Sequence, residues 1–347
     1  MNQKKLSIVV PAYNMENYIA RCLDSIFISK EPEERYEVIV VNDGSKDKTK
    51  DIVNEYLPKH QNLTLISQEN QGLSAARNAG LERITGDYVW FVDSDDAITD
   101  GSITKILDSF ECYSNADFLI FDWISYYVDR DEKARRHALL PRDYKYYEKA
   151  LKREKANSML RNGVPWLFVY KSEYLKQHDL KFLKGILFED NEFRMRVFFF
   201  AKEIRFIPFA HYVYSLNRSG SISTEARKSD SYSDKHVDSI MKTAESWLQF
   251  KNENVQTTAD KKYVAFSLCK MYGYLIRIAS KFTPEQERVY GNNVDAWKRN
   301  FKRAFANSFS IHSLSPKILF RYFVTLYFPK YYDNISLKYL KSVLNLR

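Results

Sequence analysis

The chain of 347 residues lacks the features of disulfide-stabilised, secreted and membrane-spanning proteins. Its three cysteines, Cys22, Cys112 and Cys269, are too widely spaced for a disulfide framework or a thiolate metal site. No apolar run approaches the roughly 20 residues that a membrane-spanning helix needs. The apolar run that begins at Leu6 breaks at Pro11, too early for a signal peptide. We therefore expect a protein of the reducing cytoplasm.

Common nucleotide-binding and catalytic signatures are also missing. No G-x-G-x-x-G follows a strand and no G-x-x-x-x-G-K-[ST] occurs, so the phosphate cradles of dinucleotide-binding and P-loop proteins are absent. The six histidines have no metal-ligand spacing, and there is no G-x-S-x-G elbow. What remains for chemistry is a set of carboxylates at the ends of predicted strands.

Charge is distributed unevenly along the chain. Residues 1–100 carry 11 Lys and Arg against 17 Asp and Glu, whereas residues 231–347 carry 19 against 9. Aromatic residues make up 15% of the sequence. The basic, aromatic C-terminal region indicates an anionic partner: a membrane surface, a phosphorylated polymer or nucleic acid.

Strand and helix patterns alternate through the first hundred residues. Apolar, β-branched runs predict strands at residues 6–13, 36–43, 63–67 and 87–93. Helical segments separate them, which predicts an α/β fold with a mostly parallel central sheet and helices on both faces.

Later patterns predict strands at 166–170 and 205–214 and a helix at 189–202. From residue 231 onward only helical periodicity remains. We expect a domain boundary in the Ser-rich, charged stretch 219–233.

Ligands of such sheets bind at the carboxyl ends of the strands. The sharpest feature there is Asp93-Ser94-Asp95-Asp96, directly after a predicted strand. Three acids in four residues repel one another unless a cation lies among them, and carboxylate and diphosphate oxygens suit Mg²⁺ or Mn²⁺. The alternative is that Asp96 or Asp100 caps the next helix, which explains one acid but not three.

At these residues the sequence resembles the family 2 inverting glycosyltransferases of the GT-A fold, in particular the bacterial branch that builds surface polysaccharides. The segments that carry the resemblance are SIVVPAYNMENYIARCLDSI, VIVVNDGSKDKT, QENQGLSAARNAGL and GDYVWFVDSDD, then more loosely FEDNEF and YSLNRSGSIS. The resemblance implies a GT-A catalytic domain at 1–225, with a nucleotide-binding half at 1–100 and an acceptor and catalytic-base half at 101–225. It says nothing about the helical region 231–347.

The resemblance assigns nucleotide-binding roles in the first half. It implies that Pro11 and Tyr13 form a shelf for the nucleobase and that Asp43 hydrogen-bonds the base, usually uracil. Asn70 and Arg77 would lie near the nucleotide, where Arg77 could meet the diphosphate bidentately.

The resemblance also assigns the metal and the base. Asp93 and Asp95 correspond to the Asp-x-Asp motif, Asp95 being the direct ligand of Mn²⁺ or Mg²⁺, and Asp190 occupies the position of the catalytic base, with Glu189 beside it. Acids at a helix start are also favoured by the helix dipole alone. A motif that often closes over the diphosphate contains Tyr214, Arg218 and Ser221.

The implied reaction is inverting transfer of a sugar from a nucleotide-diphosphate donor, a UDP-sugar, to a glycan or lipid-linked glycan. Such a reaction needs a divalent ion for the departing diphosphate and one base for the acceptor hydroxyl. A nucleotidyltransferase is the alternative enzyme, but it needs a Gly-, Arg- or Lys-rich loop near the first strand, and PAYNMEN is not one. A nucleic-acid-binding protein is a further alternative, but we find no recognition motif and expect no nucleic-acid partner.

Two segments near the C-terminus predict peripheral membrane contact. Nine of the twelve residues of Lys317–Phe328 are apolar, and Ile335–Leu346 is amphipathic. Such helices can lie in the interface of the cytoplasmic membrane, where basic side chains meet anionic lipid. The alternative is that they pack on each other, on the catalytic domain or on a partner subunit.

Overall fold

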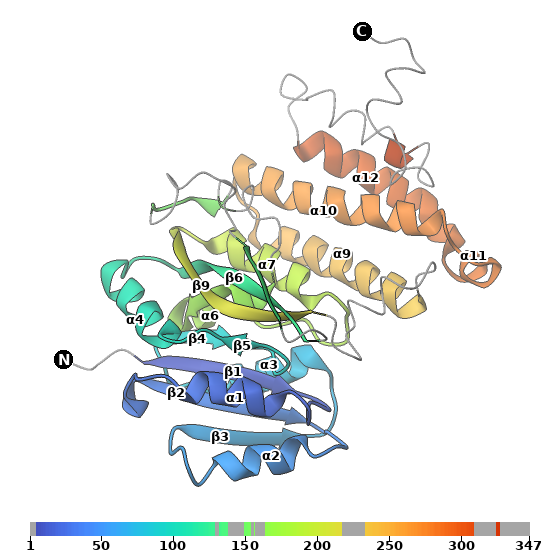
Figure 1. Ribbon diagram of the computed structural model, residues 1–347. Coiled ribbons are helices and arrows are strands. Elements are labelled where there is room, and N and C mark those ends of the chain that lie inside the picture. Colours follow the sequence, from blue (N-terminus) through green and yellow to red (C-terminus); the bar gives the residue numbers. More distant parts are fainter. Residues whose placement is uncertain are drawn as a thin grey trace. The chain divides into compact units, whose positions relative to one another are not determined.

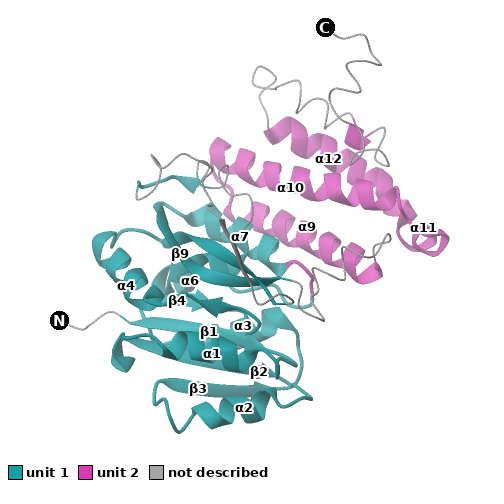
Figure 2. Ribbon diagram, viewed as in Figure 1, with its two compact units in different colours: residues 1–185, 189–221 teal, residues 186–188, 222–347 magenta. Residues whose placement is uncertain are grey.

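The computed structural model describes residues 5–128, 132–137, 149–153, 156, 164–216, 233–308 and 324–326. Two compact units divide the chain, as Figure 2 shows: unit 1 comprises residues 1–185 and 189–221, and unit 2 comprises residues 186–188 and 222–347. Arg218, Ser221 and nearly all of the two predicted membrane segments lie outside the described residues.

Unit 1 is built on one sheet with the strand order β3-β2-β1-β4-β8-β6-β9-β5, to which β7 is added through β6 (Figure 1). Its described strands are β1 (Leu6–Ala12), β2 (Tyr36–Asp43), β3 (Leu63–Gln68), β4 (Tyr88–Phe91), β5 (Ala97–Ile98), β6 (Phe118–Tyr127), β7 (Glu132–His137), β8 (Phe168–Lys171) and β9 (Ile204–Leu216).

The first four strands pair in parallel, as predicted. Antiparallel pairs enter with β8, which lies between β4 and β6, and with β5 and β7. The sheet as a whole is therefore mixed. A link as short as the one from β6 to β7 can join only antiparallel neighbours.

Helices and short 3₁₀ turns connect these strands. In the described part of unit 1 they are α1 (Ile19–Phe27), η1 (Glu33–Arg35), α2 (Thr49–Tyr56), α3 (Leu73–Leu81), α4 (Ser102–Cys112), η3 (Pro165–Leu167), α6 (Ser172–Gln177) and α7 (Glu189–Phe200). The helix predicted at 189–202 is α7, and the strand predicted at 205–214 is β9.

Side-chain alternation explains why β1 is buried throughout and β2 at every residue except Glu37. Val41 of β2 packs with Ala76 of α3 in one apolar cluster, so the odd-numbered residues of β2 point to the α3 face. The residues between them, such as Val38 and Val40, point to the opposite face and are equally buried. The sheet is thus covered on both faces, as its continuous apolar runs predict.

Gly80 lets α3 approach the sheet closely. A Cβ atom at this position would lie 2.3 Å from Cγ1 of Val9 and 3.4 Å from Cγ2 of Val41. Any larger residue would push α3, and with it Arg77 one turn earlier, away from β1.

Unit 2 is helical in its described part, where the helices are α9 (Asp234–Asn254), α10 (Thr258–Ala279), α11 (Pro284–Tyr290), the 3₁₀ turn η4 (Gly291–Asn293) and α12 (Val294–Ser308). Capping boxes start two of them: Thr257 with Asp260 begins α10, and Thr283 with Gln286 begins α11. Gly273 of α10 faces the ring of Phe301, which lies on α12.

Three residues of the predicted membrane segment are described, and they are buried. Val324 is 1% exposed and Leu326 is 7% exposed, while Cγ2 of Thr325 lies near Gly273 of α10. These three side chains are covered by protein, and membrane contact of the segment stays a prediction. No helix in the described ranges has both the length and the apolar character needed to cross a bilayer.

The close approach at Gly80 gives a stability prediction. Gly80→Ala should lower the free energy of unfolding in urea by about 1–3 kcal/mol, because the new methyl group overlaps Val9. Val9→Ala removes the overlapping atoms. The loss in the free energy of unfolding of the double variant should therefore be smaller than the sum of the two single losses by about 1 kcal/mol or more. Additive effects in this cycle would show that the two side chains do not meet.

Candidate active site

The loops that leave β1 and β2 are tied to each other at the carboxyl edge of the sheet. The side chain of Asn14 accepts a hydrogen bond from Lys46 N at 2.8 Å, and Asn14 N donates to the Ser45 hydroxyl at 3.0 Å. Met15 N donates to Thr49 Oγ1 at 2.6 Å. Tyr13, at the start of the first loop, is 43% exposed, whereas Pro11 is buried within β1. These hydrogen bonds fix the backbone of the first loop, and the side chain of Tyr13 at its start remains exposed to solvent.

Asp43, at the end of β2, organises the loop that follows β3. Its Oδ1 accepts hydrogen bonds from Gln68 Nε2 at 2.7 Å and from Gln71 N at 2.9 Å, and its Oδ2 accepts one from Gly72 N at 2.8 Å. The carboxylate expected to bind a nucleobase is therefore a buried anchor for this loop.

The turn after Asp43 requires glycine. Gly44 has φ +73°, and a Cβ there would lie 2.8 Å from Asn70 N. Asn70 itself is exposed beside this turn.

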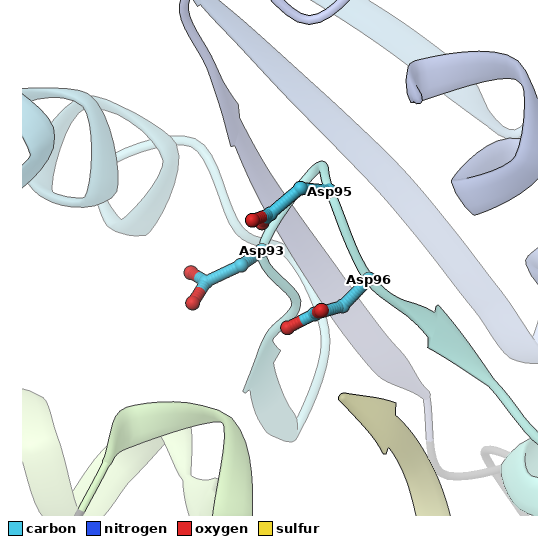
Figure 3. A group of neighbouring side chains, drawn as sticks. All are labelled: Asp93, Asp95 and Asp96. Carbon is cyan, nitrogen blue, oxygen red and sulfur yellow. The ribbon is translucent and has the colours of Figure 1, made fainter. Parts of the chain in front are cut away.

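Asp93, Asp95 and Asp96 form a cluster on the turn from β4 to β5 (Figure 3). One carboxylate oxygen from each residue lies within 4.8 Å of the others. The three are not equivalent, because Asp96 is fully buried while Asp93 and Asp95 are partly exposed. Such an oxygen set fits a hard divalent cation such as Mg²⁺ or Mn²⁺.

Asp96 is bonded to β9 rather than to the next helix. Tyr212 Oη donates to its Oδ2 and Ser215 N donates to its Oδ1, each at 2.7 Å. Burial, together with the charges of Asp95 and Asp93, raises the pKa of Asp96 well above its usual range. Helix α4 begins after Gly101 with no side-chain cap, so neither Asp96 nor Asp100 caps it. Asp93 and Asp95 are thus the better placed pair for a metal.

Arg77 joins the cluster to the start of α7. Its Nη2 lies 2.7 Å from Asp93 Oδ1 and its Nη1 lies 2.5 Å from Glu189 Oε1. The side chain is 2% exposed, and its guanidinium lies over the ring of Phe182, 5.2 Å from the centroid. Burial lowers the pKa of Arg77, but the two carboxylates outweigh it and raise that pKa. The expected diphosphate ligand thus has two carboxylates as its partners.

The pKa of Asp190 is raised toward neutral pH. Burial and the neighbouring Glu189 carboxylate raise the pKa of Asp190 to about 6, against the weaker opposing effect of a bond from Asn191 N at 2.8 Å. Both acids are in the first turn of α7. They differ in their partners, because Glu189 is paired with Arg77 and Asp190 is not.

Three residues of this site were not among those singled out from the sequence. They are Arg21, Tyr212 and Ser215, which bond to the turn that carries the three aspartates. Ser215 is the second residue of the YSLNRSGSIS segment and Tyr212 lies two residues before that segment, so it could have pointed to them. Arg21 lies in the quoted segment SIVVPAYNMENYIARCLDSI, but nothing in that segment separates it from an ordinary charge on the helix surface.

Comparison with known proteins gives consistent similarities. Residues 7–178 match the family model described as glycosyl transferase family 2. EpsH of Bacillus subtilis is 31% identical over 236 residues, which are 66% of this chain and 65% of EpsH. Glycosyltransferase GlyA of Streptococcus pneumoniae is 32% identical over 227 residues, 63% of this chain and 31% of GlyA. The chain thus spans less than two thirds of these curated relatives.

Among solved structures, residues 1–349 of S. aureus TarS in complex with UDP-GlcNAc superpose with a TM-score of 0.68 at 22% identity. The match covers 93% of this chain and 90% of that one. It establishes the GT-A fold with a C-terminal helical region, as the sequence predicted.

The Arg77 bridge predicts a large loss of stability on its removal. Arg77→Met leaves two poorly solvated carboxylates without their cation, so the free energy of unfolding in urea should fall by about 3–5 kcal/mol. Lys181→Met is the matched control, because Lys181 pairs with Glu82 on the surface and such pairs contribute at most about 1 kcal/mol. Equal losses in the two variants would contradict a structural role for the bridge.

Proposed function

Because residues 7–178 belong to glycosyl transferase family 2, we propose that this protein transfers a sugar from a nucleotide-diphosphate donor to a glycan or lipid-linked glycan acceptor. The observation that carries the proposal is the arrangement of carboxylates at the carboxyl edge of the sheet, with Asp93 and Asp95 on one turn and Asp190 across the Arg77 bridge. The reaction needs both a cation-binding pair and a separate base.

Asp95 and Asp93 would hold a divalent cation, Mn²⁺ or Mg²⁺. Arg77 bonds only Oδ1 of Asp93, so Oδ2 is available to a ligand. When bound, such an ion neutralises charge on the departing diphosphate. Asp96 would contribute by holding the turn, because both its oxygens already accept hydrogen bonds from β9.

Asp190 would accept the proton of the acceptor hydroxyl as the new glycosidic bond forms. A pKa of about 6 leaves it ionised at neutral pH and still basic enough to take a proton. Direct displacement with a single base inverts the anomeric centre, and no enzyme nucleophile is required. Glu189 would orient the start of α7 through Arg77 rather than act as the base.

The donor would bind across the loops after β1, β2 and β3. Exposed Tyr13 offers a ring for a nucleobase, and buried Pro11 supports it. Asp43 would act mainly through the loop it holds, which presents Asn70. The TarS structure of the same fold contains UDP-GlcNAc, which supports a UDP-sugar as donor.

The relatives support a proposal for the acceptor class. One of them, of Bacillus spizizenii, is a poly(ribitol-phosphate) beta-glucosyltransferase, 44% identical over 96 residues that are 27% of this chain and 15% of that protein. A surface polymer or its lipid-linked precursor is therefore the proposed acceptor, and a peripheral site at the inner face of the membrane would suit such an acceptor.

Release of the nucleoside diphosphate, UDP or GDP, over a panel of UDP- and GDP-sugars tests the proposed function. The wild type should release UDP from at least one sugar with Mn²⁺ or Mg²⁺ and lose this activity in EDTA. Asp95→Asn should lose most activity without unfolding, because a metal ligand is removed. Asp87→Asn, at the other end of β4, is the matched control and should behave as the wild type. Full turnover in EDTA would rule out the metal, and no release from any sugar would rule out the function.

The role of Asp190 gives a pH prediction. Since the base works only when ionised, kcat/KM should be half-maximal near pH 6, level off about one unit higher, and fall about tenfold per unit at lower pH. Asp190→Asn should lower the transfer rate at least about 10²-fold and keep the affinity for UDP. Compared with Asp190→Asn, Glu189→Gln should lower the transfer rate less and the melting temperature more. If Glu189→Gln is the less active variant, the base is assigned to the wrong neighbour.

A further inference from the structure

Arg21 extends from α1 to the turn that carries the three aspartates. Its Nη2 donates a hydrogen bond to the main-chain carbonyl of Asp95 at 2.7 Å and another to the Ser215 hydroxyl. The Ser215 hydroxyl donates to the same carbonyl, also at 2.7 Å. One carbonyl oxygen therefore accepts bonds from two side chains on separate elements, α1 and β9.

The guanidinium of Arg21 is held in a fixed orientation. Its Cζ lies 5.0 Å from the centroid of the Tyr126 ring on β6. Its Nε is buried and has no hydrogen-bond partner among the described residues. A buried donor without a partner is unfavourable, so the bonds at Nη2 and the ring contact must outweigh the cost of this orientation.

Each acid of the turn has a tether of its own. Arg77 holds the side chain of Asp93, and β9 holds the side chain of Asp96. For Asp95 the tether acts on the main chain: a fixed carbonyl fixes the peptide between Asp95 and Asp96 and so limits where the Asp95 side chain can point. We propose that Arg21 is a positioning residue that orients Asp95 for the divalent cation. This rests on the proposed function, in which Asp95 is a metal ligand.

Charge and position act in opposite directions at this residue. As a nearby cation, Arg21 repels a divalent ion, so its removal would tighten metal binding if charge were its only effect. As a tether it orders a ligand in advance, so its removal weakens metal binding. Mutation of groups that orient metal ligands typically costs about 10–100-fold in affinity. The sign of the change therefore separates the two roles.

The test measures Mn²⁺ affinity directly, from the electron paramagnetic resonance signal of free Mn²⁺ in the presence of UDP. Arg21→Met should raise the Mn²⁺ dissociation constant about tenfold. Arg21→Lys keeps the charge but loses the planar fork, and it should weaken binding as well. Arg35→Met is the matched control, because Arg35 is another largely buried arginine paired with carboxylates, Glu31 and Glu111. It should leave Mn²⁺ affinity unchanged.

Unchanged or tighter Mn²⁺ binding by Arg21→Met, or wild-type affinity in Arg21→Lys, overturns the proposal. If Arg21→Met does not fold, Ser215→Ala decides, because it removes both the second donor to the Asp95 carbonyl and the hydroxyl that accepts a hydrogen bond from Arg21; weaker binding supports the proposal and unchanged binding contradicts it. A wild type that binds no Mn²⁺ with UDP would instead refute the metal site of the proposed function. A wild type that binds Mn²⁺ while the variants bind it more weakly is a different result, and it leaves the proposed metal site intact.

Discussion

The ion pairs of Arg77 connect three parts of unit 1 that the chain builds separately: α3, the turn after β4 and the start of α7. A buried guanidinium is tolerated only with counter-charges in contact, and here each counter-charge comes from a different functional segment. The turn of the three aspartates and the first turn of α7, which would hold the metal and the base under the proposed function, are therefore fixed relative to each other by one side chain. The region still holds more acids than cations, since Arg77 carries one positive charge against the two carboxylates it contacts, and Asp95 and Asp190 add to them. This excess of negative charge is what a divalent ion would offset.

The position of α3 is part of the same constraint. Gly80 allows the helix to lie against Val9, and the loop before the helix is anchored by the carboxylate of Asp43. The helix is thus fixed at its start by hydrogen bonds and near its end by close packing, with Arg77 between the two. The position of the Arg77 guanidinium thus depends on the packing of Gly80 and on the loop held by Asp43, neither of which takes part in the proposed reaction.

The sequence predicted the N-terminal half of the sheet well, because residues 6–12 and 36–41 are mostly apolar runs, the first ending at Pro11-Ala12-Tyr13-Asn14 and the second stopped by Asp43-Gly44-Ser45. It did not predict β6, although Phe118–Phe121 is apolar, or the antiparallel place of β8 between β4 and β6. Strand order depends on contacts between residues distant in sequence, which local periodicity does not contain. For the same reason motifs could identify Asp93, Asp95 and Asp190 as chemical groups but not the partners of Arg77. The pairing of Arg77 with Glu189 joins residues 112 positions apart.

Ser215 has a consequence for how such a protein can vary. Its backbone amide donates a hydrogen bond to the Asp96 side chain, and its hydroxyl donates one to the Asp95 carbonyl. The last residues of β9 and the turn after β4 are therefore joined by the same hydrogen bonds. Substitutions at 21, 95, 96, 212 and 215 are therefore not independent: a change acceptable at one position depends on what stands at the others. During evolution these residues would have to be replaced together, or in an order that always leaves the Asp95 carbonyl with a hydrogen-bond donor. The neighbouring loops could diverge without this constraint.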